Sequence, residues 1–255
     1  MATGEAPRRR DEVASRAPSH VLPGAVAAAE LLAPLGWGEA PRIGILGDSG
    51  TGKTAAAEKI VAAYLARVPG VAVVIDDKHV PCRFRGQERR DVAELAARPP
   101  VAEPRVLVFR GDIRSGVQVD AESVAEFAWA LSARGRPCLV VYDELGRAAA
   151  DGEWLPGCKR IPAAFGQGRA VGISSLWSTQ SPQDAPRAAF EQSSAILVFR
   201  MAGMGVALLR RRDYLSGDAQ STIESLPGDD VPPAQRGTFV VLKRGRPFDG
   251  RRFRF

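Results

Sequence analysis

Residues 47–54 of this chain read Gly47-Asp48-Ser49-Gly50-Thr51-Gly52-Lys53-Thr54. This spacing is typical of a phosphate-binding loop, in which glycines let successive backbone N–H groups turn inward toward the phosphates. Lys53 is then placed to reach the β- and γ-phosphates during catalysis, and the Thr54 hydroxyl to ligate Mg²⁺. We therefore expect all eight residues to bind ATP.

The sequence on either side supplies the structural context that such a loop requires. Residues 42–46 form an apolar run that predicts a strand, and residues 55–61 are strong helix formers. A glycine-rich turn that matches by chance is the alternative. Strand, loop and helix in this order favour the phosphate-binding interpretation.

The length and charge of the chain are those of one globular domain with a basic surface. Its 255 residues suit a single α/β domain, which we expect over 23–255, after a flexible basic arm over 1–22. The net charge is +6 and the pI about 9.6. This surplus fits a polyanionic partner such as nucleic acid, and equally a merely soluble surface.

The cysteines and histidines are too few and too scattered for a disulfide framework or a zinc site. Cys82, Cys138 and Cys158 form no C-x-x-C pair, and neither His20 nor His79 lies at metal-ligand spacing from them. The basic and then apolar N-terminal stretch imitates a secretion signal, but prolines and a glutamate interrupt it. Nothing else approaches a membrane span, so we expect a cytoplasmic protein.

Apolar runs alternate with helical segments along most of the chain. Strands are expected at 71–76, 105–109, 139–142, 173–178 and 195–199. Helices are expected at 23–35, 53–67, 121–133, 161–170 and 185–192. This alternation predicts an α/β fold with a mainly parallel sheet flanked by helices.

The C-terminal residues 238–242 and 252–255 predict a β-hairpin. Arg and Phe alternate in its second strand. Such a strand could clamp nucleic acid, but the alternation more commonly marks one buried and one solvated face, which is the interpretation we favour.

Two adjacent carboxylates follow the strand at 139–142. Asp143 is expected to hold Mg²⁺ through its water shell, and Glu144 to polarise the attacking water. An acidic pair at a strand end could instead cap a helix. The phosphate loop upstream favours the nucleotide role, and Glu144 argues for ATP hydrolysis rather than for a kinase.

A polar amide, Gln180, ends the next strand and is followed by Ser181-Pro182. Gln180 could reach the γ-phosphate and sense its loss, as a positioned Gln orients water in other NTPases. The alternative is a turn-forming polar residue before a proline. We take Gln180 as a catalytic candidate.

The order of these motifs resembles the FtsK/HerA superfamily of DNA-pumping ATPases. The matching stretches are residues 47–54, 74–78, 139–144, 168–173 and 178–182. In that family a basic residue, a small-residue turn and a strand ending Thr-Gln-x-Pro follow the acidic strand in this way. The combination is specific, and the resemblance spans residues 42–200.

The resemblance implies a RecA-like P-loop NTPase core of the type that has an additional catalytic glutamate. It further implies a homo-oligomeric ring, commonly a hexamer, which uses ATP to move double-stranded DNA without reading its sequence. The chain is expected to lack room for the membrane segments of FtsK or the N-terminal barrel of HerA.

A core of this length resembles the genome-packaging ATPases of tailless icosahedral viruses with internal membranes. That resemblance implies capsid vertex proteins as further partners and a location in the host cytoplasm and the virion. A DNA transfer ATPase of a plasmid or integrated element would look similar. An assembly or export ATPase that acts on protein is a third alternative.

Arginines are expected to complete the machinery. Arg169 stands where the family places a basic residue facing the adjacent subunit, which implies a guanidinium supplied in trans to the neighbour's ATP. Arg160 or Arg187 could hold this role instead, and Arg169 could merely offset the dipole at a helix end. The arginine-rich segments 83–90 and 110–114 are candidate contacts to DNA phosphates.

Overall fold

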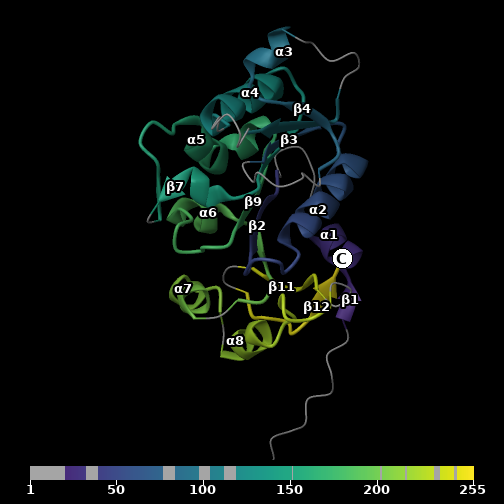
Figure 1. Ribbon diagram of the computed structural model, residues 1–255, viewed down its shortest axis with the longest axis vertical. Coiled ribbons are helices and arrows are strands. Elements are labelled where there is room, and N and C mark those ends of the chain that lie inside the picture. The colour runs from purple at the N-terminus through teal and green to yellow at the C-terminus, as the bar shows by residue number, and fades with distance from the viewer. Residues whose placement is uncertain are drawn as a thin grey trace, which may run out of the picture.

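The computed structural model describes residues 21–32, 40–76, 84–97, 104–111, 119–150, 152–201, 203–215, 217–232, 236–243 and 246–255. A sheet of ten strands lies at its centre (Figure 1). Side by side, the strands are β1 (Val21–Pro23), β12 (Arg252–Arg254), β11 (Thr238–Leu242), β10 (Ala195–Val198), β2 (Arg42–Leu46), β9 (Ile173–Thr179), β6 (Cys138–Tyr142), β3 (Val71–Asp76), β5 (Val106–Arg110) and β4 (Gln87–Arg89). The strands from β10 to β4 are all parallel, whereas β11 is antiparallel to both of its neighbours.

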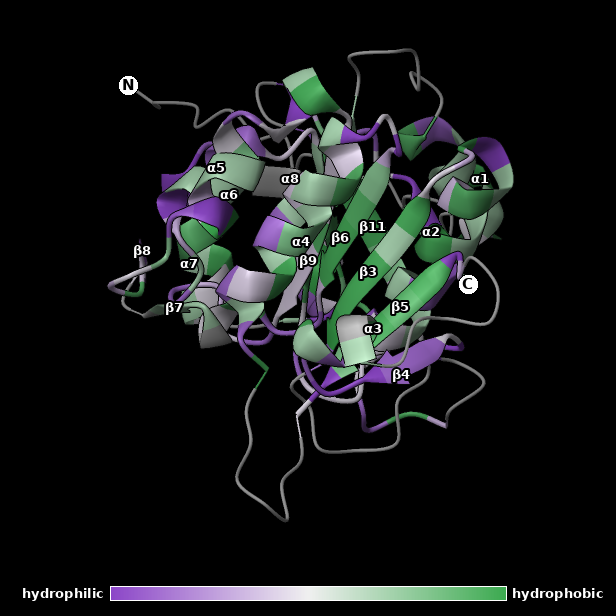
Figure 2. Ribbon diagram, turned by 90° about the horizontal axis from the view of Figure 1, so that it is seen from above, coloured by the Kyte–Doolittle hydropathy of each residue, from purple (hydrophilic) through white to green (hydrophobic). Residues whose placement is uncertain are grey.

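Apolar side chains on both faces of the strands explain why helices cover both sides of the sheet. Along β3, Val71 and Val73 pack into one hydrophobic core, and Ala72 and Val74 into the other, because successive side chains point to opposite faces. Figure 2 shows the apolar strands β3 and β5 between α4 on one side and α1 and α2 on the other. The sheet is therefore a buried layer.

The helices fall into two groups according to the core that they cover. One core includes residues of α1 (Gly24–Leu31) and α2 (Lys53–Arg67). The other includes residues of five helices, namely α4 (Ala121–Ala133), α5 (Arg160–Gly166), α6 (Arg187–Gln192), α7 (Met204–Arg211) and α8 (Gly217–Glu224). The short elements are α3 (Ala93–Ala97), the 3₁₀ turns η1 (Leu145–Arg147) and η2 (Gly168–Val171), and the two-stranded pair β7 (Ala149–Ala150) and β8 (Glu153–Trp154).

The expected α/β architecture with a mainly parallel sheet is confirmed, and several boundaries differ. The helix expected over 161–170 is wrong as a single element, since α5 ends at Gly166 and η2 follows it. Glycines within the segment weaken a continuous helix. The helix expected from residue 185 begins at Arg187, because the preceding Pro186 adopts an extended conformation.

The ends of the described chain meet at one border of the sheet. β12 pairs antiparallel with β11, as predicted, and Phe253 is buried while its neighbours are half-buried. One face of this strand is therefore packed, as the favoured interpretation of its alternation requires. Val21 and Leu22 pair with β12, so the sheet begins before residue 23, and residues 1–20 of the predicted arm lie outside the described residues.

Two further expectations concern membranes and metals. Among the described residues, no helix is both long and apolar enough to cross a membrane. The same part of the chain holds no cluster of three or more His, Cys, Asp or Glu that could bind a metal ion. Cys138 and Cys158 are free thiols, while Cys82, His20 and His79 lie outside the described residues.

Candidate nucleotide-binding site

The phosphate loop joins the carboxyl end of β2 to the start of α2, as its flanking sequence predicts. Two glycines are required by the fold. Gly47 has φ +151°, and a Cβ there would lie 2.6 Å from the Cβ of Phe199. Gly52 has φ +106°, and its Cβ would lie 3.0 Å from the Cα of Gly237. Any larger residue at either position would displace backbone or core atoms.

Lys53 is held inside the loop by the carbonyls of that loop. Its ammonium donates to the carbonyl oxygens of Gly47 at 2.7 Å and Asp48 at 2.6 Å, and the residue is only 5% exposed. The Thr51 hydroxyl donates to the Asp48 carbonyl at 2.8 Å. The loop thus encloses a positive charge, which is an arrangement suited to phosphate.

Asp143 lies against the start of α2 on the same sheet edge. Its Oδ1 accepts hydrogen bonds from the Thr54 hydroxyl at 3.4 Å and from the Ser178 hydroxyl at 3.2 Å. The Asp143 N–H donates to the Ile75 carbonyl at 3.1 Å, so the carboxylate is fixed by β3, β9 and α2 together. A buried carboxylate beside a hydroxyl is the donor set that fits Mg²⁺.

Glu144 and Gln180 meet at the same edge. The backbone N–H of Gln180 donates to Glu144 Oε1 at 3.3 Å. Glu144 is half-buried, and the Gln180 side chain is exposed. The structure therefore joins these two candidates through the main chain of Gln180 and fixes the carboxylate of Glu144 beside Asp143.

Solved structures share this fold. No protein-family model and no curated protein sequence matches the chain. The genome packaging NTPase B204 from Sulfolobus turreted icosahedral virus 2, in complex with AMPPCP, superposes with a TM-score of 0.60 at 15% identity, covering 79% of this chain and 91% of that one. The DNA-packaging ATPase B204 from Sulfolobus turreted icosahedral virus gives 0.58 at 15% identity, covering 80% and 93%. The pCW3 conjugation coupling protein TcpA with ATPγS gives 0.50 at 16% identity, covering 85% and 60%.

This chain has the fold of a P-loop ATPase. At these identities the likeness establishes the fold alone, and it confirms the core that the sequence resemblance implied. Within that fold, the phosphate loop, Asp143 and Glu144 occupy the carboxyl edge of a parallel sheet, where ligands bind in such architectures.

Arg169 lies far from the phosphate loop of its own chain. It is exposed in η2, whereas Gln180 follows the opposite end of β9. Seven strand residues separate the two ends, which is about 20 Å at the usual rise of a strand. Arg169 is therefore not part of the site at the phosphate loop of its own chain.

Of the other basic candidates, three are held in ion pairs, Arg85, Arg89 and Arg90 lie in or beside β4, and the rest lie outside the described residues. Arg160 pairs with Glu126 at 3.4 Å and Arg187 with Glu191 at 2.7 Å. Arg110, in one of the segments expected to contact DNA, lies 3.5 Å from Asp76 and 3.2 Å from Glu88, so carboxylates offset its charge. Residues 83 and 112–114 are outside the described part of the chain, as are 77–78 of the resemblance.

Sequence reasoning missed three residues around the loop. Ser178 donates to Asp143, and its signal in the sequence is a hydroxyl at the end of a strand beside an acidic strand end. Asp229 and Arg236 pack on the loop tip, since a Cβ on Gly50 would lie 3.2 Å from the Cβ of Asp229 and 3.9 Å from an Arg236 guanidinium nitrogen. No local pattern marks these two.

Proposed function

We propose that this chain binds and hydrolyses ATP with Mg²⁺ and uses the energy to move duplex DNA without regard to its sequence. The observation that carries the proposal is the convergence of Lys53, Thr54, Asp143 and Glu144 at one sheet edge within a P-loop ATPase fold. In support, the B204 structures that share this fold are described as a packaging NTPase and a DNA-packaging ATPase.

The residues have distinct parts in hydrolysis. Amides of the phosphate loop and the Lys53 ammonium bind the β- and γ-phosphates, and Thr54 and Asp143 would hold Mg²⁺. The bound ion supplies positive charge that offsets the charge developing on the phosphate oxygens. Glu144 orients and polarises the water that attacks the γ-phosphorus, and it accepts a proton from that water.

Glu144 is suited to this part because the Gln180 N–H fixes one of its oxygens. The contact also gives a physical route for a nucleotide signal: a change in the position of Glu144 moves the main chain that follows β9. We propose the Gln180 side chain as the group that senses the γ-phosphate.

A ring of identical subunits, six by resemblance, completes the proposal. Arg169 stands at the opposite edge from its own ATP, so we assign it to the site of the adjacent subunit, where a guanidinium would stabilise charge on the transferred phosphate. Hydrolysis would then require assembly.

Viral genome packaging is the role we favour, with capsid vertex proteins as further partners, since both B204 structures carry that description. A conjugation role has the specific support of the coupling protein TcpA, which shares the fold at a TM-score of 0.50. Both roles act on DNA, whereas an export ATPase would act on protein.

The experiment that tests the DNA proposal is ATP turnover by the purified chain with and without duplex DNA. We expect two duplexes of equal length and unrelated sequence to stimulate hydrolysis equally, with a stimulation that falls steeply with salt because phosphate binding releases counterions. Turnover that ignores DNA at low salt would favour the export alternative. A strong preference for one duplex would contradict sequence-independent movement.

A further inference from the structure

Arginines gather at the amino-terminal ends of the parallel strands, opposite the phosphate loop. Because β2, β9, β6, β3 and β5 are parallel, the segments that lead into them lie along one edge, and the ATP site lies along the other. The described leading segments, residues 40–42, 67–70, 104–105, 134–137 and 168–172, contain no Asp or Glu. They contain six arginines: Arg42, Arg67, Arg105, Arg134, Arg136 and Arg169.

Backbone hydrogen bonds continue from the sheet into these segments. The Arg105 carbonyl accepts from the Ala72 N–H at 2.8 Å, and the Pro137 carbonyl accepts from the Val71 N–H at 3.0 Å. The arginines are therefore set on a rigid scaffold. Since neighbouring strands lie about 4.8 Å apart, the starts of the five strands extend over about 19 Å.

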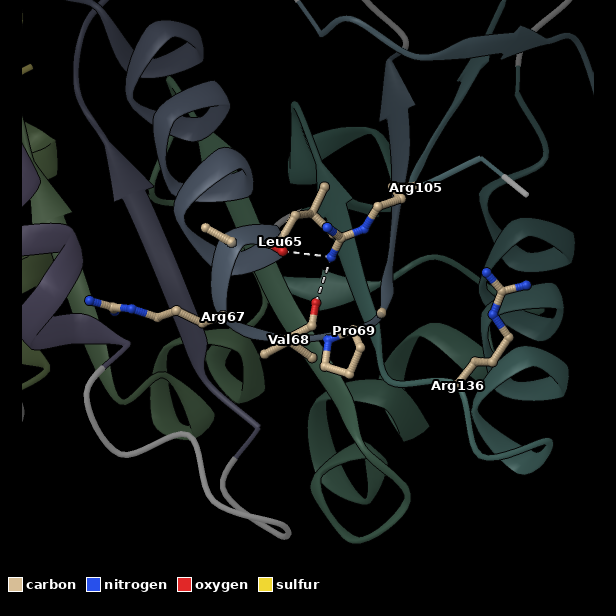
Figure 3. A pocket seen from close by; sticks show the side chains of 8 residues that line it. Leu65, Arg67, Val68, Pro69, Arg105 and Arg136 are labelled. Carbon is tan, nitrogen blue, oxygen red and sulfur yellow. Dashed lines mark hydrogen bonds between the residues drawn. The ribbon is translucent and has the colours of Figure 1, made fainter. Parts of the chain in front are cut away.

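A cavity of about 590 Å³ opens at this edge beside the end of α2. Arg67, Arg105 and Arg136 are among the described residues that line it, and none of those residues is acidic. Arg105 reaches across the end of α2 and donates to the carbonyls of Leu65 at 2.5 Å and Val68 at 2.7 Å (Figure 3). Figure 3 shows Arg136 on the other side of the opening, whereas Arg67 points away from both Arg105 and Arg136. Arg67 donates to the Ala29 carbonyl of α1 at 3.3 Å.

Arg105 thus stabilises the end of α2 while its guanidinium lies at the opening of the cavity. The last carbonyls of a helix have no partner within the helix, and Arg105 satisfies two carbonyls there. Four of the arginines are exposed and Arg136 is half-buried, the exposed ones being Arg67, Arg105, Arg134 and Arg169.

The positive potential at this edge affects the one arginine that is buried. Arg42 is 3% exposed and donates to the side-chain carbonyl of Gln192 at 2.8 Å. Its pKa is lowered, first by burial and then by the charge of Arg169. Like charges gathered in this way repel one another, and an anion that binds among them relieves the repulsion.

We propose that the row formed by Arg67, Arg105, Arg134 and Arg136, called the arginine rim below, binds the phosphate backbone of duplex DNA. The choice of DNA as the polyanion rests on the proposed function. Guanidinium groups pair with phosphate through two hydrogen bonds. The starts of β6, β3 and β5, which these four arginines precede, span about 10 Å. Duplex DNA carries one charge per about 1.7 Å with both strands counted, so this length of duplex holds about 6 phosphates.

The shape of the rim suits backbone contact without base reading. Its arginines lie at the end of α2 and in the turns that precede strands, and contacts from such positions to phosphates carry no sequence information. The contacts therefore bind any sequence alike.

The test compares two double variants that remove the same charge from different places. Arg67→Gln with Arg136→Gln alters the rim and leaves Arg105 on the end of α2 and Arg169 in place. Arg210→Gln with Arg211→Gln alters two exposed arginines on α7, which follows the opposite end of β10. Affinity for two duplexes of equal length and unrelated sequence is measured at several salt concentrations with a non-hydrolysable ATP analogue.

For the rim variant we expect weaker binding to both duplexes by the same factor. Its plot of log affinity against log salt should be less steep by about 2, because each removed arginine leaves one phosphate without its neutralising charge. The α7 variant should keep the slope of the parent. ATP turnover without DNA should match the parent in both variants, which also shows that the fold is intact.

The other possible results would contradict either the rim proposal or the proposed function. If the parent binds DNA and the rim variant keeps its affinity and slope, the rim does not bind DNA, while the proposed function stands. If both double variants lose affinity for DNA equally, binding depends on the overall charge of the protein and not on the rim. If the rim variant loses binding to polyglutamate but binds DNA as the parent does, the rim binds an acidic protein segment and not DNA. A parent that binds no DNA at low salt overturns the proposed function and the rim together.

Discussion

Removing the Ser178 hydroxyl should weaken Mg²⁺ binding and leave the fold intact. The hydroxyl donates to Asp143 Oδ1 at 3.2 Å, and both residues are buried. A hydrogen bond to a charged group contributes about 1.5–3 kcal/mol, which corresponds to about 10- to 100-fold in affinity. Loss of a group that orients a metal ligand has about the same effect. We expect Ser178→Ala to need about 10- to 100-fold more Mg²⁺ for half-maximal ATP turnover.

Ser175→Ala is the matched control on the same strand. Ser175 is fully buried, and its hydroxyl has no hydrogen-bond partner within the described part of the chain. The substitution deletes the same atom without touching Asp143. We expect an unchanged Mg²⁺ requirement and a free energy of unfolding that is equal to the parent's or slightly higher, because an unsatisfied hydroxyl is removed from the core.

The assay titrates Mg²⁺ at saturating ATP and measures ATP binding separately in the presence of a chelator. Ser178→Ala should shift the Mg²⁺ midpoint while metal-free nucleotide binds as it does to the parent. If Ser178→Ala and Ser175→Ala share the parent's midpoint, Ser178 does not orient Asp143. If both variants shift equally, the effect comes from packing of β9 and the reasoning fails.

Four other substitutions test the remaining parts of the account. Lys53→Ala should abolish turnover and strongly weaken ATP binding, since it removes the charge that the phosphate loop encloses; hydrolysis at the parent rate would show that the loop is misassigned. Glu144→Gln should slow hydrolysis by about 100-fold or more and leave binding nearly intact, because its amide oxygen still accepts from the Gln180 N–H; normal turnover would move the role to another carboxylate. Mixed rings of Arg169→Ala and Lys53→Ala subunits should regain turnover that neither has alone, and full DNA-stimulated activity of Arg169→Ala by itself would rule out the trans role. Gly44→Ala should lower the free energy of unfolding by about 1–3 kcal/mol in a denaturant titration, since a Cβ there would lie 2.6 Å from a ring carbon of Trp177; unchanged stability would mean that the ring can move aside.

The core of the fold and the phosphate loop could be predicted because their signals are local. A complete loop between a strand and a helix specifies backbone geometry, and apolar runs specify strands buried on both faces. The location of Asp143 and Glu144 near the phosphate loop could also be predicted, because the carboxyl ends of parallel strands lie along the same side of the sheet. These residues sit where the motif spacing placed them.

Other features depend on contacts between distant segments. Val21 joins the sheet only because Arg252 lies beside it, and Gly237 approaches the phosphate loop through a hydrogen bond from its N–H to the Thr51 carbonyl at 3.1 Å. No local sequence pattern indicates either of these two contacts. The charge on Arg110 is offset by Glu88, 22 positions away in the chain. The basic residues near Arg110 in the sequence therefore do not indicate a positively charged environment in the structure.

Displacement of a third strand from a DNA triplex would show whether ATP hydrolysis drives movement along duplex DNA. A labelled third strand is annealed to one end of a duplex, and its release is followed after the chain and ATP are added. We expect release that requires ATP, occurs equally on unrelated duplex sequences, and is absent with Glu144→Gln. Vigorous DNA-stimulated ATP hydrolysis that leaves the third strand in place would contradict it.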